Sequence, residues 1–268
     1  MDFRQLIREE RRRAAETKSS NREMTVPKKA TEKTVTSSSW QNSTLRVWTT
    51  RPNRIEIEKF RKGPIPGIYY LPNWINEEEE KAILDQVYAI SDQSDVWVNL
   101  KHRRLQMWGG EVKTPFSPTP LPPWLMQISH TLVDVGIFSE DKRPNHILIN
   151  VGGMKRNQKR INTGWLEYGV GDFILPHEDG PAYFPLVAII STGTECRVTF
   201  ERHRAATDPT TQSDKLPESF DFSLARRSLL LFTGESYTRY LHSIDNIETG
   251  TRISLTIRHV NEAKEGKQ

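Results

Sequence analysis

Short apolar runs, bounded by proline, glycine or polar residues, recur along the chain from about residue 45 onward. Several such runs divided by turn signals are typical of strands in a β-sandwich or jelly roll. The polar stretch 202–220 interrupts them and predicts a loop between two strands. We predict strands at residues 146–150, 171–176, 186–191, 196–201, 228–233 and 251–260.

Two segments show helical patterns instead. Asn76 precedes a run of glutamates and then apolar residues from Ala82 to Tyr88, which indicates an N-capped helix of about twelve residues. Residues 124–138 carry apolar side chains near helical spacing and predict a second helix. The expected fold class is therefore mainly β with flanking helices (α+β), in a domain that spans residues 45–262.

The first residues differ from this domain. Residues 1–15 contain helix-forming residues with Phe3, Leu6 and Ile7 on one face, and residues 17–39 are rich in Ser, Thr, Lys and Glu. A stretch with so little apolar surface cannot form a core, so we predict a disordered linker there. We therefore assign residues 1–44 to a basic N-terminal helix and linker, and residues 263–268 to a C-terminal tail.

Positive charge is concentrated at the N-terminus. The first 39 residues contain ten Lys or Arg and six Asp or Glu, whereas the rest of the chain contains 28 of each. Because the predicted domain is neutral, nucleic-acid binding would depend on local clusters such as residues 101–104. With no apolar run long enough for a bilayer, no secretory signal and a single cysteine, Cys196, we expect an intracellular protein of the nucleus or cytoplasm, without a membrane anchor.

Candidate chemistry appears in residues 168–180, which read as a Gly-rich turn next to an extended stretch with His177 and Asp179 two residues apart. Side chains two apart on a strand share one face, so an imidazole nitrogen and a carboxylate oxygen can reach one metal ion. His242, next to another apolar run, is the third candidate ligand. Two histidines and a carboxylate form the triad that holds non-haem Fe(II) with open positions. We therefore predict His177, Asp179 and His242 as catalytic metal ligands.

Ten residues after His242, the segment 252–258 carries two arginines. If this segment is a strand, Arg252, Ser254, Thr256 and Arg258 lie on one face. Guanidinium groups bind carboxylates through paired hydrogen bonds, so this face could clamp a dicarboxylate beside the metal.

Together these segments resemble the AlkB family of Fe(II)- and 2-oxoglutarate-dependent dioxygenases, most closely its homologue-six subgroup. The resemblance implies a double-stranded β-helix, or jelly roll, with Fe(II) in its open end and 2-oxoglutarate and O2 as co-substrates. It also implies oxidative demethylation of alkylated RNA or DNA as the activity. The similar segments are residues 103–110, 144–150, 176–183, 241–243 and 252–260.

The resemblance assigns roles to individual residues. Arg252 would bind the distal carboxylate of 2-oxoglutarate and Arg258 the proximal one, although Arg258 could instead pair with a carboxylate inside the fold. Our own candidates near the substrate mouth are residues 101–104, with Arg103 and Arg104, and Tyr183. The residues implied around the co-substrate are Asn150, Tyr168, Arg252, Ser254 and Arg258.

The sequence departs from the family pattern after Asn150. Family members carry Asn and Tyr two residues apart on one strand, whereas Asn150 and Tyr168 are eighteen apart. Residues 151–166 are basic and polar where a buried strand should continue, and removing them would restore Asn-Glu-Tyr. Our hypothesis is that residues 151–166 are an atypical insertion that arose from a retained intron or an error in the gene model.

Other chemistries fit the sequence less well. The segment around His177 lacks the second histidine of the helical zinc-protease motif, and residues 234–238 lack the final glycine of a nucleophile elbow. Two alternatives to a nucleic-acid demethylase stay open. The first is a protein hydroxylase or demethylase with the same iron site, and the second is a non-catalytic nucleic-acid-binding scaffold.

Overall fold

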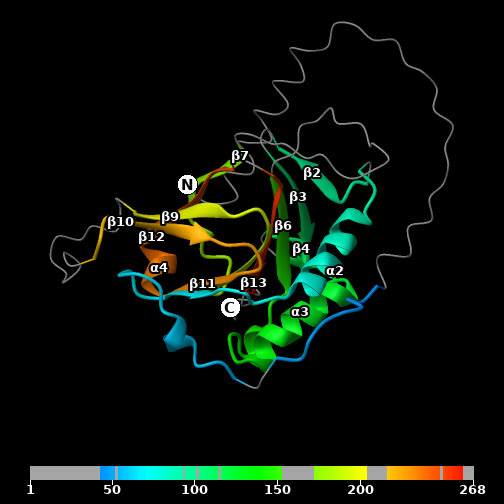
Figure 1. The fold of residues 1–268 in the computed structure, drawn as a ribbon, viewed down its shortest axis with the longest axis horizontal. Helices are drawn as coiled ribbons and strands as arrows, with labels where there is room; N and C mark the ends of the chain where they lie inside the picture. Colours follow the sequence, from blue (N-terminus) through cyan, green and yellow to red (C-terminus); the bar gives the residue numbers. More distant parts are fainter. Residues whose placement is uncertain are drawn as a thin grey trace, which may run out of the picture.

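Three layers stack in the computed structural model: a pair of helices, a larger antiparallel sheet and a smaller antiparallel sheet (Figure 1). The predicted N-terminal helix and linker, Tyr168 and the C-terminal tail all lie outside the part of the chain that the structure describes. The described residues are 43–51, 54–92, 94–100, 103–113, 116–152, 172–203, 216–247 and 250–261.

Within the described residues, the larger sheet has the strand order β1-β11-β8-β13-β6-β3-β2 and the smaller sheet the order β10-β9-β12-β7, and β4 pairs with β5. In chain order the elements are η1 (Ile57–Phe60), β1 (Ile68–Leu71), α2 (Glu77–Tyr88), β2 (Trp97–Asn99), β3 (Arg103–Trp108), β4 (Gly110–Glu111), β5 (Ser117–Pro118), α3 (Pro123–Asp134), η2 (Glu140–Lys142), β6 (His146–Gly152), β7 (Asp172–His177), β8 (Leu186–Gly193), β9 (Cys196–Arg202), β10 (Ser219–Leu224), β11 (Leu229–Thr233), α4 (Glu235–Thr238), β12 (Tyr240–Ile247) and β13 (Arg252–Arg258).

Strand β6 shows how alternation divides the two faces of the larger sheet. Ile147, Ile149 and Val151 belong to the apolar core that contains the buried faces of α2 and α3. The alternate positions, including Leu148 and Asn150, line a cavity between the sheets. The six predicted strands are all present with small shifts at their ends, and the predicted mainly β jelly roll with flanking helices is confirmed.

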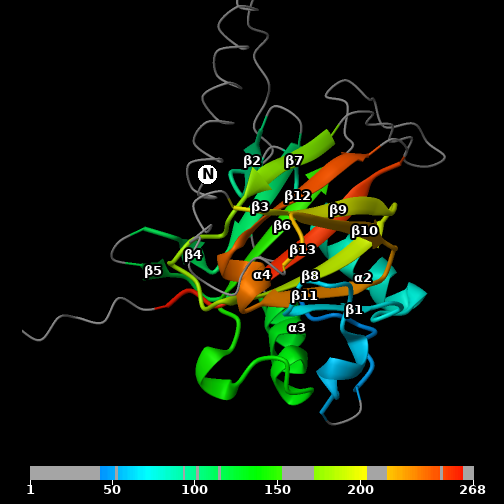
Figure 2. The ribbon, with the colours of Figure 1, turned by 90° about the vertical axis from the view of Figure 1, so that its left-hand side faces the viewer.

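A second apolar core fills one end of the space between the sheets. Ile189 and Phe232 of the larger sheet meet Phe200 and Ile244 of the smaller one there. At the other end, β7 and β12 run side by side near β3 and β6 (Figure 2). The apolar filling is incomplete between these strands and β13, and the polar residues of the site lie in that gap.

One segment differs from the sequence prediction. The predicted loop 202–220 was wrong at its end, because β10 starts at Ser219 and pairs with β9 along its length. Phe222 and Leu224 are buried, and the alternate polar residues Ser219, Asp221 and Ser223 are exposed. Strand β3 ends at Trp108 and is followed by Gly109 and Gly110, both with positive φ.

The hypothesis that residues 151–166 are an insertion stays a prediction, and the structure describes only the first two of these residues. Val151 and Gly152 continue β6 and pair with β3 on one side and β13 on the other. The physical reason is that Val151 is apolar and fully buried toward the helices, as its position in the strand requires. Residues 153–171 lie outside the described residues.

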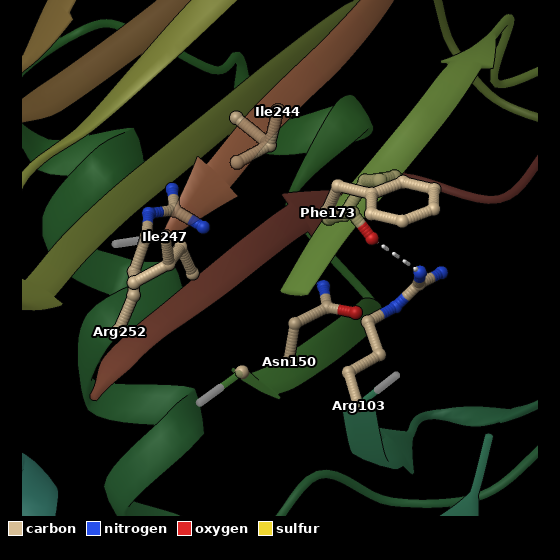
Figure 3. A pocket seen from close by; sticks show the side chains of 8 residues that line it. Arg103, Asn150, Phe173, Ile244, Ile247 and Arg252 are labelled. Carbon is tan, nitrogen blue, oxygen red and sulfur yellow. Dashed lines mark hydrogen bonds between the residues drawn. The ribbon is translucent and has the colours of Figure 1, made fainter. Parts of the chain in front are cut away.

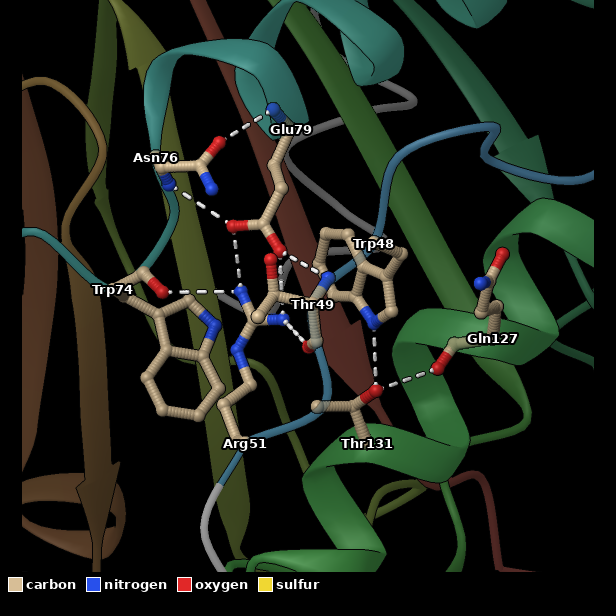
Figure 4. Close-up of polar contacts among 8 residues, drawn as sticks. All are labelled: Trp48, Thr49, Arg51, Trp74, Asn76, Glu79, Gln127 and Thr131. Carbon is tan, nitrogen blue, oxygen red and sulfur yellow. Dashed lines mark hydrogen bonds and ion pairs between the residues drawn. The ribbon is translucent and has the colours of Figure 1, made fainter.

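Helix α2 begins at the predicted N-cap, Asn76. The Asn76 side chain accepts a hydrogen bond from the Glu79 amide at 2.8 Å, and the Glu79 carboxylate accepts one from the Asn76 amide at 2.9 Å. The same carboxylate also accepts from the Thr49 amide at 2.7 Å and from two nitrogens of Arg51 at 2.9 and 3.0 Å (Figure 4). Glu79 therefore joins the start of the described domain to the helix.

Helix α3 begins with Pro123 at its first helical position, where proline costs no hydrogen bond. Trp124, Ile128 and Leu132 line its buried face, and the helix ends before Gly136, earlier than the predicted end at residue 138. Positive φ at Gly136 stops the helix there. Among the described residues, no helix has both the length and the apolar character needed to cross a membrane.

We predict that Glu79→Gln lowers the free energy of unfolding by roughly 3 kcal/mol, because it leaves a buried guanidinium without its negative partner. The side chain of Arg51 is only 9% exposed and that of Glu79 2%, so water cannot replace the lost charge. Urea unfolding at neutral pH measures the change. Glu78→Gln, at an exposed position one residue earlier, is the matched control and should cost less than about 0.5 kcal/mol.

The Arg51–Glu79 ion pair also predicts that the free energy of unfolding depends on pH. Burial raises the pKa of Glu79, but hydrogen bonds from Asn76, Thr49 and Arg51 outweigh it and hold the pKa below the ordinary value of 4.5. A lowered folded-state pKa gives stability that is present above the unfolded pKa and lost as the pH falls through the folded one. The difference between wild type and Glu79→Gln should therefore shrink below about pH 4.5; a difference that is constant down to acid pH would contradict this assignment.

Candidate metal centre

Three predicted ligands converge where the smaller sheet lines the interior. His177 is the last residue of β7, Asp179 lies two residues beyond it, and His242 in β12 is the direct cross-strand partner of His177. The ligand atoms of all three lie within 4.8 Å of one another, and all three side chains are buried. The two imidazole rings are 4.2 Å apart between centroids, and His242 Nε2 is 3.9 Å from Asp179 Oδ2. Strand pairing therefore brings together two segments that are remote in the sequence.

The imidazoles are held in the form that binds metals. His177 Nδ1 lies 2.8 Å from the Leu175 carbonyl oxygen, to which it donates, so Nε2 is the nitrogen left for a metal. Burial, followed by the neighbouring His242, lowers the pKa of His177 well below its ordinary value. Burial also lowers the pKa of His242. Both rings are therefore neutral at physiological pH, as metal coordination requires.

Asp179 carries the negative charge of the cluster. Burial raises the pKa of its carboxyl group, but Arg258 and then the two imidazoles more than reverse this effect and lower it. Arg258 forms an ion pair with Asp179 Oδ1, and its guanidinium carbon lies 4.1 Å from the ring centre of Tyr183. Asp179 Oδ2 is buried with no hydrogen-bond partner among the described residues. A buried carboxylate oxygen beside two neutral imidazoles is the donor set that a divalent transition metal fits.

A cavity opens from these ligands along the inner face of β13. The predicted alternation of β13 is confirmed, because Arg252, Ser254, Thr256 and Arg258 all line this cavity. Arg252 donates to Ser254 Oγ at 2.9 Å and to Ser191 Oγ at 3.1 Å. Asn150 lines the same cavity from β6, and its side-chain oxygen has no hydrogen-bond partner among the described residues.

The predicted substrate residues are placed in three different surroundings. Arg103 is buried and shares the inner face of β3 with Leu105, whereas Arg104 lies on the opposite face, over the Trp97 ring and paired with Asp92. Tyr183 is buried beneath Arg258. The structure therefore brings Arg103 and Tyr183 toward the site but not Arg104.

Two residues near the site were not predicted from the sequence. Tyr237 donates its hydroxyl hydrogen to the Gly180 carbonyl at 2.8 Å, which fixes the turn after Asp179. His146 is fully buried, its ring centre is 5.7 Å from that of Tyr183, and burial lowers its pKa to about 3. The sequence did carry a signal for His146, because its two-residue spacing from Leu148 and Asn150 puts it on the same face.

A double antiparallel sheet that holds a buried His-x-Asp and a distant His, next to a cavity with an arginine, defines a non-haem Fe(II) oxygenase of the 2-oxoglutarate-dependent class. Comparison with known proteins identifies the family. The chain is 31% identical over 239 residues to a Danio rerio protein named "Probable RNA/DNA demethylase ALKBH6". The alignment covers 77% of this chain and 91% of that protein. This chain belongs to the AlkB family, and membership together with the triad implies Fe(II) and 2-oxoglutarate.

Other similarities are weaker. The chain is 27% identical over 221 residues to an Arabidopsis thaliana protein named "Alkylated DNA repair protein ALKBH8 homolog", with 73% of this chain and 59% of that protein aligned. The solved structure of OsALKBH1 covers 74% of this chain and 100% of its own, at 13% identity and a TM-score of 0.48. The solved structure of a Burkholderia pseudomallei oxidoreductase of the 2OG-Fe(II) oxygenase family covers 74% of this chain and 86% of its own, at 12% identity and a TM-score of 0.45. No family model matches the sequence.

We predict that His177→Ala and His242→Ala each weaken divalent-metal binding by at least about 100-fold, since each removes one of three ligands. The measurement is anaerobic calorimetric titration with Mn(II), together with the increase in melting temperature that metal binding gives the wild type. His130→Ala, at an exposed histidine on α3, is the matched control. Unchanged Mn(II) affinity in either ligand variant would exclude this site.

Proposed function

We propose that this protein oxidatively demethylates alkylated nucleic acid, with His177, Asp179 and His242 as the iron ligands. The observation that carries the proposal is the convergence of these three buried side chains beside a cavity that also contains Arg252. Three protein ligands leave coordination positions open for 2-oxoglutarate and O2. When bound, Fe(II) and 2-oxoglutarate supply the oxidation of a C–H bond by O2, with conversion of 2-oxoglutarate to succinate and CO2.

The residues of β13 have separate tasks in this proposal. Arg252 binds the distal carboxylate of 2-oxoglutarate, and the hydroxyls of Ser254 and Ser191 hold its guanidinium in place at 2.9 and 3.1 Å. For Arg258, the ion pair with Asp179 favours a role within the fold over direct contact with the co-substrate. Arg258 keeps Asp179 ionised and aimed at the metal. Asn150 faces the same cavity and is assigned to the co-substrate; the predicted role of Tyr168 stays a prediction.

Apolar side chains form the remaining wall of the cavity. Leu148, Ile174, Ile189, Val198, Leu230 and Ile244 surround the metal ligands and the β13 row. Exclusion of water strengthens the ionic contacts of Arg252 and protects reactive species from side reactions. This wall suits a site in which oxidation must be directed to one substrate.

The substrate class is inferred from the chemistry and the relatives. Hydroxylation of a methyl group on nitrogen leads to its loss as formaldehyde, so the same oxidation yields demethylation of an alkylated base. The names of two relatives refer to an RNA/DNA demethylase and to alkylated DNA repair. We assign methylated RNA or DNA as the substrate on these grounds.

Succinate formation from 2-oxoglutarate, with Fe(II), ascorbate and O2, tests the proposal. Asp179→Ala should abolish turnover, and Arg252→Met should raise the KM for 2-oxoglutarate by roughly 30-fold or more, because one partner of a buried ionic contact is lost. Arg197→Met, at an exposed arginine of β9, is the matched control and should leave the KM unchanged.

The choice of substrate is decided in the same assay. Methylated oligonucleotides should stimulate succinate formation and release formaldehyde, whereas methylated peptides should not. Stimulation by peptides alone would support the protein hydroxylase or demethylase instead. Binding of oligonucleotides with no turnover in a metal-loaded protein would support the non-catalytic scaffold.

A further inference from the structure

The three metal ligands are not held by the same kind of contact. Pairing between β7 and β12 ends at His177 and His242, which are direct partners. This ladder positions both imidazoles but does not reach Asp179, two residues further along the chain. The backbone that carries Asp179 must therefore be held in place by other contacts.

The co-substrate end of the cavity is built differently. Asn150 and Arg252 belong to β6 and β13, which pair with each other in the interior of the larger sheet. Their side chains enter the same space between the two sheets (Figure 3). Each of these strands has a neighbour on both sides, which keeps the residues it carries in a fixed position. The position of Asp179, in contrast, depends on the turn that follows it.

One contact to this turn comes from α4. The Tyr237 hydroxyl donates to the Gly180 carbonyl at 2.8 Å, and Gly180 follows Asp179 directly, with a positive φ of 86°. Because Gly180 is buried, water has little access to replace this hydrogen bond. Burial and then the Asp179 carboxylate raise the pKa of Tyr237, so the hydroxyl keeps its hydrogen at physiological pH and donates it.

The ring of Tyr237 is fixed as well. It stacks on Phe232 with 6.3 Å between ring centres, and the Phe232 ring centre lies 4.7 Å from that of His242. The fully buried Ser236 hydroxyl accepts from the Thr233 amide at 3.1 Å and donates to the Thr233 carbonyl at 2.8 Å, which holds α4 against the end of β11. Strand β12 begins two residues after α4 ends. The contact therefore ties the turn to the segment that carries the third ligand.

We propose that Tyr237 is a positioning residue for the metal ligand Asp179. Arg258 pairs with one carboxylate oxygen, whereas Tyr237 fixes the backbone so that the other oxygen faces the two imidazoles. The inference rests on the proposed function, because it takes Asp179 as an iron ligand. Removal of the hydroxyl takes the hydrogen bond from a buried carbonyl, and the turn then relaxes and displaces the carboxylate from the metal.

Tyr237→Phe tests the inference on the full chain, because it removes the hydroxyl and keeps the ring on Phe232. Tyr240→Phe is the matched control. Tyr240 lies two residues before His242 and also donates to a backbone carbonyl, that of Pro217, at 2.8 Å. Each variant loses one tyrosine hydrogen bond, so both should lower the melting temperature of the metal-free protein by about 2–4 °C. Only Tyr237→Phe should change the metal centre.

Two measurements report on the metal centre. Anaerobic calorimetric titration should show an Mn(II) affinity that is about tenfold weaker for Tyr237→Phe and unchanged for Tyr240→Phe, because contacts that orient a ligand contribute to metal affinity. The visible absorption of the Co(II)-loaded protein depends on the number and geometry of the ligands, and a role in stability alone does not alter it. This absorption should change for Tyr237→Phe and match the wild type for Tyr240→Phe.

Each outcome supports or contradicts the inference. Wild-type Mn(II) affinity in Tyr237→Phe overturns it, and so does equal weakening by both variants, which would indicate a general effect on stability. Weaker affinity with an unchanged Co(II) absorption also contradicts it, since Asp179 would then have kept its position. If His177→Ala weakens Mn(II) binding and Tyr237→Phe does not, the inference fails while the metal site of the proposed function stands. Failure of the wild type to bind Mn(II) overturns both.

Discussion

The ion pair between Asp179 and Arg258 is the interaction on which the site depends. Arg258 belongs to the larger sheet and Asp179 follows β7 of the smaller one, so the pair joins the two sheets at the metal ligands. Its charges cancel, which makes a ligand set of one carboxylate and two neutral imidazoles tolerable in a buried site. In the proposed function, Fe(II) would add two positive charges and Arg252 one, and the two carboxylates of 2-oxoglutarate would offset two of these three.

Along the same strands, residues that pack in the apolar core alternate with residues that line the cavity. In β6, the residues facing the helices are apolar and hold the sheet in the main core, while alternate residues reach the cavity. The same division in β13 places Arg252, Ser254, Thr256 and Arg258 along one wall. Rigid, doubly covered strands therefore carry the polar groups, which keeps their geometry fixed.

The sequence revealed the parts of the site that follow from local spacing. His177 and Asp179 were found from a two-residue separation, the four inward residues of β13 from alternation, and the start of α2 from Asn76 and the glutamates after it. What could not be predicted depends on pairing between distant strands. The placement of Arg103 and Arg252 on either side of Gly152 follows from register alone, and β10 was missed because its exposed polar residues resemble the loop before it.

The central claim is that three side chains hold one ferrous ion that 2-oxoglutarate then chelates. A 2-oxo acid bound through two oxygens to Fe(II) gives a weak visible charge-transfer absorption, so anaerobic titration measures this state directly. The account predicts an absorption band when Fe(II) and 2-oxoglutarate are both added to the wild type, with neither alone sufficient, and no band for Asp179→Ala. A wild-type protein that binds Fe(II) and 2-oxoglutarate without producing the band would contradict it.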